Sequence, residues 1–180
     1  MTGEFRHLGD EILHDGFVVK LCRSTFEAPD GTRFERDVVR HPGAVSVVPL
    51  MDDGTVVLVR QYRAAIDSLV LEIPAGKRDV PGEAPETTAA RELIEEVGLA
   101  AGRLDHLAVF HNSIGFSDEE SHVFLGTQLE PAPMDRQGIE EQHMEMVRVP
   151  LTATAAMIAA GEITDAKTVI GLTLALARQE

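Results

Sequence analysis

The stretch that decides the fold runs from Gly76 to Leu99 and reads GKRDVPGEAPETTAARELIEEVGL. Its second half predicts one helix. Pro85 suits the first helical turn, Glu86 is favourable beside the positive end of the helix dipole, and Gly98 is a typical stop signal. The first half is rich in Gly and Pro and predicts a loop that leads into this helix.

The predicted helix has two chemically different faces. Successive helical side chains lie about 100° apart, which places Glu92, Glu95 and Glu96 on one face with Arg91 beside them. The opposite face is apolar and contains Ala90, Leu93, Ile94 and Val97. Three neighbouring carboxylates repel one another, and no Lys separates them. The pattern therefore indicates either a site for a divalent cation or a solvated amphipathic helix with an ordinary Arg91–Glu95 ion pair.

Composition narrows the classes of function. The chain has 180 residues, 16 Lys and Arg against 30 Asp and Glu, and a net charge of −14. This charge repels nucleic-acid backbones, and a protein of this kind that handles phosphate esters needs cations at its site. No apolar run is long enough for a membrane span, and no secretory signal is visible. The lone Cys22 fits a reducing cytoplasm, so we expect a cytoplasmic protein.

The remainder of the chain reads mostly as strands. Asp30-Gly31 and Asp53-Gly54 predict hairpin turns. The predicted strands are 17–26, 44–51, 55–62, 69–74, 104–110, 121–129 and 144–149. A polar loop covers 130–144, a helix is expected over 152–160, and a last helix, capped by Thr164 or Asp165, runs to about residue 178.

The spacing from Gly76 onward resembles the Nudix box, G-x5-E-x7-R-E-U-x-E-E-x-G-U, in which U is aliphatic. Every fixed position is filled, and the one departure is that six residues rather than five separate Gly76 from Glu83. Nudix hydrolases cut a nucleoside diphosphate linked to another moiety with the help of a divalent metal, usually Mg²⁺, for which Mn²⁺ can substitute. The resemblance implies that Glu92, Glu95, Glu96 and the Ala75 carbonyl are metal ligands.

The same resemblance implies a fold. It is of the α+β class, an α/β/α sandwich with a mixed β-sheet between helices, in residues 43–180. Residues 1–42 are expected to form an N-terminal antiparallel β-subdomain through which two chains pair, exchanging strands in a homodimer. In the catalytic machinery, Arg91 matches the arginine that orients a glutamate, and Glu95 is expected to take part in catalysis as well as in metal binding.

Outside the box, segments in order along the chain resemble the ADP-ribose pyrophosphatase-like branch. They are 36–45, 61–63, 72–76, 115–119 and 161–163. The resemblance implies that Arg63 contacts the substrate diphosphate and that Arg36 reaches in from the neighbouring subunit, although both also read as surface residues. The other substrate-binding residues expected from these segments are Glu72, Gly115, Phe116 and Ser117.

The branch often takes its general base from a mobile acidic loop. Here the loop reads GIEEQHME over residues 138–145, and we favour Glu141, with Glu140 and Glu145 as rivals. His143 is a further acid/base candidate at its usual pKa. A solvated acidic loop without a catalytic role is the alternative.

The expected activity is Mg²⁺-dependent hydrolysis of ADP-ribose or a related nucleoside diphosphate sugar to a nucleoside monophosphate and a sugar phosphate. Ile114 stands where ADP-ribose-cleaving members commonly have a proline, which leaves room for a GDP- or UDP-linked hexose. Two alternatives are a Nudix module that senses a nucleotide sugar without cutting it and a pyrophosphatase that acts on dinucleoside polyphosphates or NADH. Neither a nucleic-acid partner nor a membrane is expected.

Overall fold

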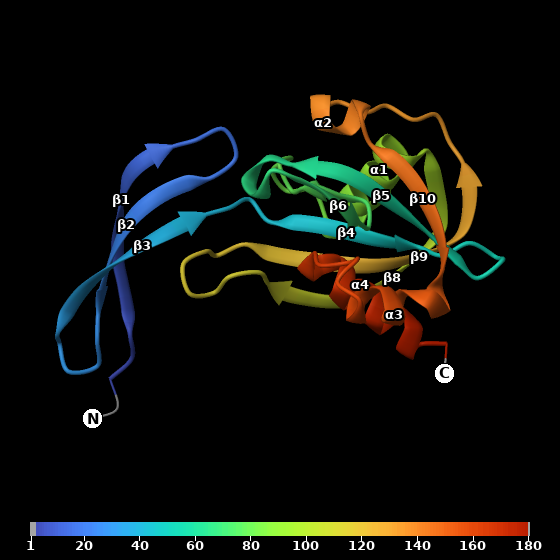
Figure 1. Ribbon diagram of the computed structural model, residues 1–180. Helices are drawn as coiled ribbons and strands as arrows, with labels where there is room; N and C mark the ends of the chain where they lie inside the picture. The colour runs from blue at the N-terminus through green and yellow to red at the C-terminus, as the bar shows by residue number, and fades with distance from the viewer. Residues whose placement is uncertain (1–2, 180) are drawn as a thin grey trace. The chain divides into compact units, whose positions relative to one another are not determined.

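The computed structural model describes residues 3–179, and contacts divide the chain into two units (Figure 1). The first unit runs to Gly43 and also contains His111–Glu120, and the second unit is the remainder of the chain. The boundary predicted after residue 42 does not foresee that residues 111–120 belong with the N-terminal strands.

The first unit contains a three-stranded antiparallel sheet. In order across the sheet its strands are β1 (Arg6–Asp15), β2 (Lys20–Glu27) and β3 (Arg33–Arg40). The predicted hairpin turn joins β2 to β3: Gly31 has a φ of 87°, and Thr32 N–H donates to Asp30 Oδ1 at 2.9 Å. The predicted strand 17–26 is wrong at its start, because residues 17–19 belong to the connection between β1 and β2.

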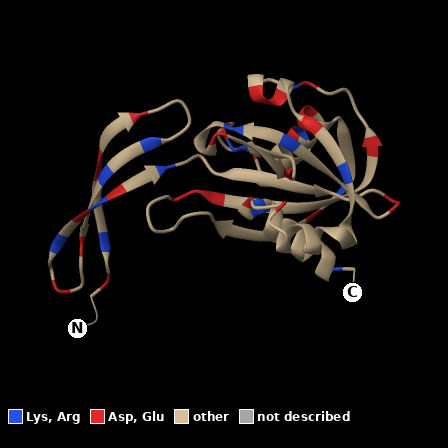
Figure 2. Cartoon of the chain, in the orientation of Figure 1, with Lys and Arg blue, Asp and Glu red and all other residues tan. Residues whose placement is uncertain are grey.

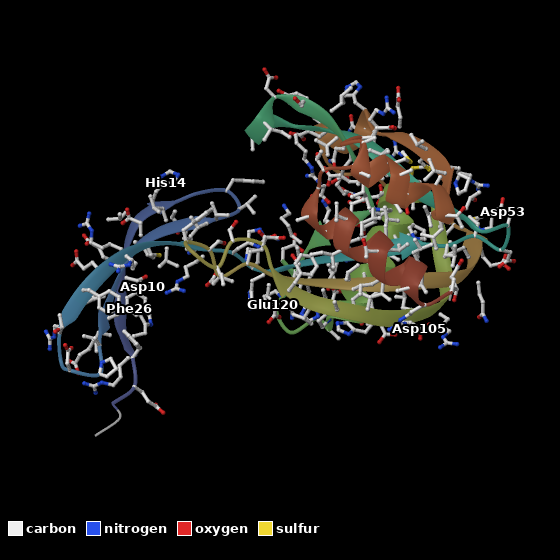
Figure 3. All side chains as sticks on the ribbon, turned by 60° about the horizontal axis from the view of Figure 1, so that its bottom comes forward. Asp10, His14, Phe26, Asp53, Asp105 and Glu120 are labelled. Atoms are coloured by element: carbon white, nitrogen blue, oxygen red, sulfur yellow. The ribbon has the colours of Figure 1, made fainter. Side chains whose placement is uncertain are left out.

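Arg40 holds the first unit together. Its Nε and Nη2 donate to the two carboxylate oxygens of Asp10 at 3.0 and 3.1 Å, and its Nη1 donates to Asp118 at 3.1 Å. The guanidinium holds the pKa of Asp10, labelled on β1 in Figure 3, well below its usual range. Val39 N–H donates to the carbonyl oxygen of Phe116 at 2.7 Å. These contacts attach residues 111–120 to the sheet.

The second unit contains two sheets. The strands of the first sheet, in order, are β7 (Ala75–Lys77), β4 (Ala44–Pro49), β9 (Glu120–Pro131) and β8 (Leu99–His111). Those of the second sheet are β10 (Glu145–Pro150), β5 (Thr55–Arg63) and β6 (Ser68–Glu72). Strand β4 runs parallel to β9 and antiparallel to β7, so the predicted mixed sheet is confirmed.

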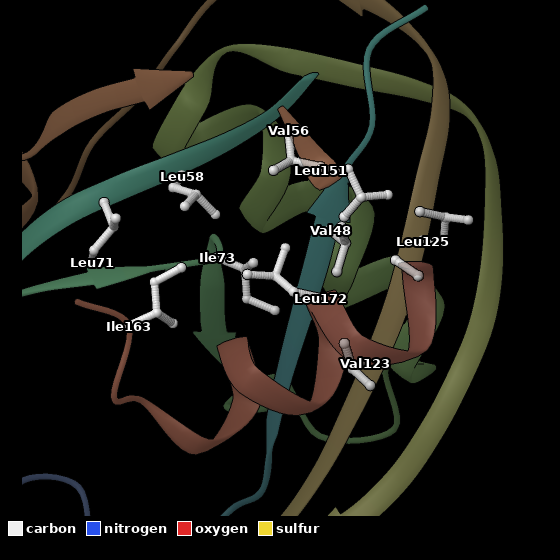
Figure 4. Close-up of a cluster of buried hydrophobic side chains, with 11 residues drawn as sticks. Val48, Val56, Leu58, Leu71, Ile73, Val123, Leu125, Leu151, Ile163 and Leu172 are labelled. Atoms are coloured by element: carbon white, nitrogen blue, oxygen red, sulfur yellow. The ribbon is translucent and has the colours of Figure 1, made fainter. Parts of the chain in front are cut away.

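Helices cover this part of the chain from two sides because β4 alternates its buried side chains between them. Val45 and Val47 pack with Leu93 of helix α1 (Pro85–Val97), whereas Val48 packs with Leu172 of helix α4 (Ala166–Ala177). Helix α3 (Thr154–Ala159) lies beside α4 (Figure 1). Figure 4 shows the cluster under α4, which includes Val48, Val56, Leu58, Ile73, Val123 and Leu172. The predicted helix–sheet–helix layering is confirmed.

Three elements differ from the sequence prediction. Residues 75–77 form β7 rather than the start of a loop, because pairing of Val45 with Gly76 extends the sheet. A short helix, α2 (Ile139–Gln142), lies within the predicted polar loop, and a 3₁₀ turn (Leu151–Ala153) precedes α3. Within residues 3–179, no helix is both long enough and apolar enough to cross a membrane.

Candidate functional site

Helix α1 presents the predicted carboxylates because its apolar side is fixed in the core. Leu93 and Ala89 are fully buried, and Gly98 ends the helix with a φ of 65° while its N–H donates to the Ile94 carbonyl at 2.9 Å. The helix therefore cannot rotate without exposing apolar surface. This orientation determines where Glu92, Glu95 and Glu96 lie.

Glu96 is the most deeply buried of the three glutamates. Glu96 is only 4% exposed, and its Oε2 accepts a hydrogen bond from Ala75 N–H at 2.9 Å. Burial raises its pKa to about 8, and the nearby carboxylates of Glu92 and Glu141 act in the same direction, whereas Ala75 N–H and Arg63 lower it. The site thus contains a buried acid with too little positive charge around it.

Glu92 and Glu95 share one arginine. Arg91 Nη1 lies 2.8 Å from Glu92 Oε1 and 3.0 Å from Glu95 Oε2. Burial raises the pKa of Glu92 to about 7, although Arg91 lowers it. The Glu92 carboxylate occupies the room that Gly76 leaves, because a Cβ added at Gly76 would lie 1.9 Å from Glu92 Cδ. The predicted role of Arg91 in orienting a glutamate fits these contacts.

The residues fit a divalent cation in their chemistry. In residues 3–179, no group of three or more His, Cys, Asp or Glu side chains has an arrangement that could hold a metal ion, and Arg91 contacts both Glu92 and Glu95. Hard carboxylate oxygens nevertheless suit Mg²⁺. The pKa values of Glu92 and Glu96 are raised by burial, so a nearby cation would favour the ionised form of both.

Arg63 is held beside this acidic face by Glu72. Arg63 Nε and Nη2 donate to the two oxygens of Glu72 at 2.7 and 2.6 Å, which is a bidentate ion pair. Glu72 is 1% exposed and also pairs with Lys167. Both oxygens of Glu72 are engaged in the interior, which gives this residue a role in orienting Arg63. Its predicted contact with substrate stays a prediction.

Lys167 is a residue that the sequence reasoning missed. It comes from the first turn of α4, and its Nζ contacts Glu72 and lies 3.0 Å from Asp165 Oδ2. Asp165 caps α4 by accepting from Thr168 N–H at 3.0 Å, and the Thr168 hydroxyl accepts from Ile73 N–H at 2.9 Å. These bonds attach the start of α4 to the segment that precedes β7.

The acidic loop brings one of its glutamates toward α1. Figure 2 shows acidic residues in red on the short helix α2. The charge of Glu141, one residue of this helix, raises the pKa of Glu96. Its carboxylate accepts from Gln137 N–H at 2.9 Å and from Gly138 N–H at 3.3 Å. Glu140 and Glu145 are both exposed, and neither is among the groups that perturb Glu96.

The other predicted substrate residues belong to the first unit. Arg36 lies on β3 with its guanidinium over the Phe34 ring at 4.8 Å, and its Nη1 donates to the Glu35 carbonyl at 2.7 Å. Phe116 is exposed, and Ser117 Oγ accepts from Glu119 N–H at 3.2 Å. A Cβ added at Gly115 would meet no atom within 4 Å, so the space around this residue is open. Their contact with substrate remains a prediction.

Comparison with known proteins places these residues in a family. A family model described as the NUDIX domain matches residues 40–169, which include the whole acidic helix. An ADP-ribose pyrophosphatase of Bacillus subtilis (strain 168) is 38% identical over 165 residues, covering 92% of this chain and 89% of its own. A GDP-mannose pyrophosphatase of Citrobacter koseri is 31% identical over 185 aligned positions, covering 94% of each chain.

The fold has a solved counterpart. The crystal structure of an ADP compounds hydrolase superposes with a TM-score of 0.84 at 23% identity, over 99% of this chain and 95% of the other. At this identity the likeness concerns the fold, and it extends to the N-terminal strands as well as the helix-covered sheets. With the filled Gly76–Leu99 pattern and the family match, it shows that the chain belongs to the Nudix family of hydrolases.

Proposed function

We propose that this protein hydrolyses the diphosphate bond of ADP-ribose or a related nucleoside diphosphate sugar, releasing a nucleoside monophosphate and a sugar phosphate. The observation that carries the proposal is the buried Glu96 of α1, which accepts a hydrogen bond from Ala75 N–H and is influenced by the charges of both Arg63 and Glu141. Relatives named for ADP-ribose and GDP-mannose pyrophosphatase activity support the substrate class.

In this proposal Glu92, Glu95, Glu96 and the Ala75 carbonyl hold Mg²⁺, with Mn²⁺ as a substitute. A divalent cation bound there would neutralise diphosphate charge and lower the pKa of bound water. Nudix hydrolases generally use divalent metal ions, and the buried carboxylates described above are ligands of the type that Mg²⁺ prefers. Arg91 contacts both Glu92 and Glu95 and so orients them.

Arg63 binds the diphosphate. Glu72 occupies its Nε and Nη2, which leaves Nη1 for a phosphate oxygen. A guanidinium fixed along one edge loses little freedom when it binds a ligand with the other. Glu141 takes the proton of the attacking water, because it is the loop carboxylate close to Glu96.

A turnover panel tests the proposed activity. With Mg²⁺ we expect hydrolysis of ADP-ribose or of another nucleoside diphosphate sugar and little turnover of NADH or dinucleoside polyphosphates. Glu96→Gln should lower kcat by roughly 100-fold or more, the scale on which removing one charge-stabilising group acts. Products are identified by chromatography. Tight binding of a sugar nucleotide with no turnover of any compound would make the protein a sensor and refute the proposal.

Gly76→Ala tests the support of Glu92. The new Cβ would occupy the place of Glu92 Cδ, so the carboxylate must move while the flexible side chain keeps the backbone undisturbed. We expect kcat/KM to fall roughly 10- to 100-fold, because misplacement of a reacting group by about 1 Å has this effect. The melting temperature should change little. The control is Glu86→Gln in the exposed first turn of α1, which leaves Gly76 and Glu92 in place. Unchanged turnover in Gly76→Ala would contradict the role of Glu92.

The pH dependence of stability tests the buried acid. The pKa of Glu96 is about 8 in the fold and about 4.3 in an unfolded chain, so between these values the unfolded chain releases a proton that the fold keeps. The metal-free protein should therefore lose stability as pH rises from about 4.3 to about 8, and Mg²⁺ should stabilise it most at the upper end. Thermal unfolding with and without EDTA measures this.

The matched variants are Glu96→Gln, which should make the pH dependence shallower and leave the part due to Glu92, and Glu86→Gln in the exposed first turn of the same helix, which should not change it. An equal slope in all three proteins would show that Glu96 is ionised like a surface carboxylate.

We further propose that the protein is a homodimer paired through its N-terminal strands. Every residue of β1 is exposed, and this unit shows apolar side chains such as Ile12, which is 55% exposed, and Phe17. A three-stranded sheet with so much uncovered apolar surface needs a partner. Light scattering at micromolar concentration should give twice the chain mass. Ile12→Asp should halve it, whereas Val109→Asp on β8 should not; a monomeric wild type would contradict the proposal.

A further inference from the structure

The end of helix α1 is completed by residues from far along the chain. The helix has no basic residue in its last turn, so its own sequence does not balance the negative end of its dipole. Asp135 N–H donates to the Glu95 carbonyl at 3.2 Å, and Ala132 N–H donates to the Gly98 carbonyl at 2.8 Å. The chain that leaves β9 is therefore laid against the helix that presents the acidic face.

Arg136 makes the central contact of this junction. Its Nε donates to the Glu96 carbonyl at 2.9 Å, and its Nη1 donates to the Met144 carbonyl at 2.9 Å. The two acceptors lie 40 and 8 residues away in sequence. One planar guanidinium thus joins α1 to both ends of residues 137–143. The name acidic loop is used below for residues 137–143 alone, without Met144 and Glu145.

The acidic loop adds little to the core, although α2 lies beside β5. None of its residues is buried, and Ile139 is 72% exposed. The loop is followed by Met144, which is buried with Leu93 in the cluster under α1. A segment with so few apolar contacts takes its position from its ends. Arg136 controls one end directly and reaches the other through the Met144 carbonyl.

The backbone beside Arg136 is hydrogen-bonded to the Glu141 carboxylate, so the position of one affects the position of the other. Gln137 and Gly138 follow Arg136 directly, and their N–H groups donate to the Glu141 carboxylate. A shift of the backbone at Arg136 would therefore move the carboxylate with it. Glu141 is also the loop residue whose charge is felt by Glu96.

We propose that Arg136 is a positioning residue for the general base: by joining the Glu96 and Met144 carbonyls it holds the acidic loop, and with it Glu141, beside α1. This inference rests on the proposed hydrolase function and on Glu141 as its base. It assigns to Arg136 no contact with substrate. Its effect should appear in the chemical step and should depend on Glu141.

A double-mutant cycle tests the inference. Arg136→Met should lower kcat roughly 10- to 100-fold with little change in KM, since misplacing a catalytic group by about 1 Å has this scale. In the Glu141→Gln background the same substitution should change kcat by no more than about 2-fold, because residues that act through one another are not additive. Arg136→Lys keeps the charge but reaches one carbonyl at a time, so it should be intermediate.

Two measurements separate positioning from a general structural role. Hydrogen exchange of the Gln137 and Gly138 amides should quicken in metal-free Arg136→Met. The control is Arg178→Met, because Arg178 likewise donates to a backbone carbonyl, that of His106, at 2.8 Å. It should leave exchange in the loop and turnover unchanged. Should Arg136→Met not fold, Arg136→Lys in the two backgrounds gives the same comparison.

The outcomes distinguish the inference from the proposed function. An equal fall in kcat in both backgrounds, unchanged exchange in the loop, or full turnover by Glu141→Gln would overturn the role of Arg136 while hydrolysis itself stood. A wild type that cleaves no compound of the panel would defeat the proposed function instead. In that case amide exchange would still decide whether Arg136 holds the loop.

Discussion

The hydrogen bond from Ala75 N–H to the buried carboxylate of Glu96 is the contact on which the site depends. It joins the start of β7, the strand immediately before α1, to the last turn of that helix. Burial disfavours the ionised form of this carboxyl, and the single backbone donor does not offset that cost, so its pKa is raised. Arg63 acts in the opposite direction on the same group, and a divalent cation would do so more strongly.

Positive charge is scarce in a chain with a net charge of −14, and two of the cations lie against one buried carboxylate. Glu72 is surrounded by Arg63 and Lys167, and Lys167 is shared with Asp165. A buried ion pair is stabilising only when its partners are all present, because a charge left alone in the interior is strongly unfavourable. The complete network therefore orients Arg63 more than it stabilises the fold, because it holds one edge of the Arg63 guanidinium in place.

Features encoded by neighbouring residues were predictable from the sequence. The bounds of α1, the stop at Gly98, the Asp30-Gly31 turn and the cap at Asp165 all follow from local rules, and the structure contains each of them. Features encoded over long distances were not. A lysine in the first turn of a helix is disfavoured by the dipole, so Lys167 reads as a surface residue until Glu72, 95 residues away, is placed beside it. Arg136 is likewise one arginine in an acidic loop until the Glu96 carbonyl comes near.

The same distinction bears on substrate preference. Carboxylates that suit a cation and an arginine that suits a phosphate recognise the group that all nucleoside diphosphate sugars share, so they cannot choose among bases or sugars. Discrimination between such substrates needs side chains that meet the parts in which they differ. Relatives named for ADP-ribose and for GDP-mannose both align with more than 90% of this chain. Residues outside the acidic face, such as the exposed Ile114, are therefore where differences in preference within the family have to arise.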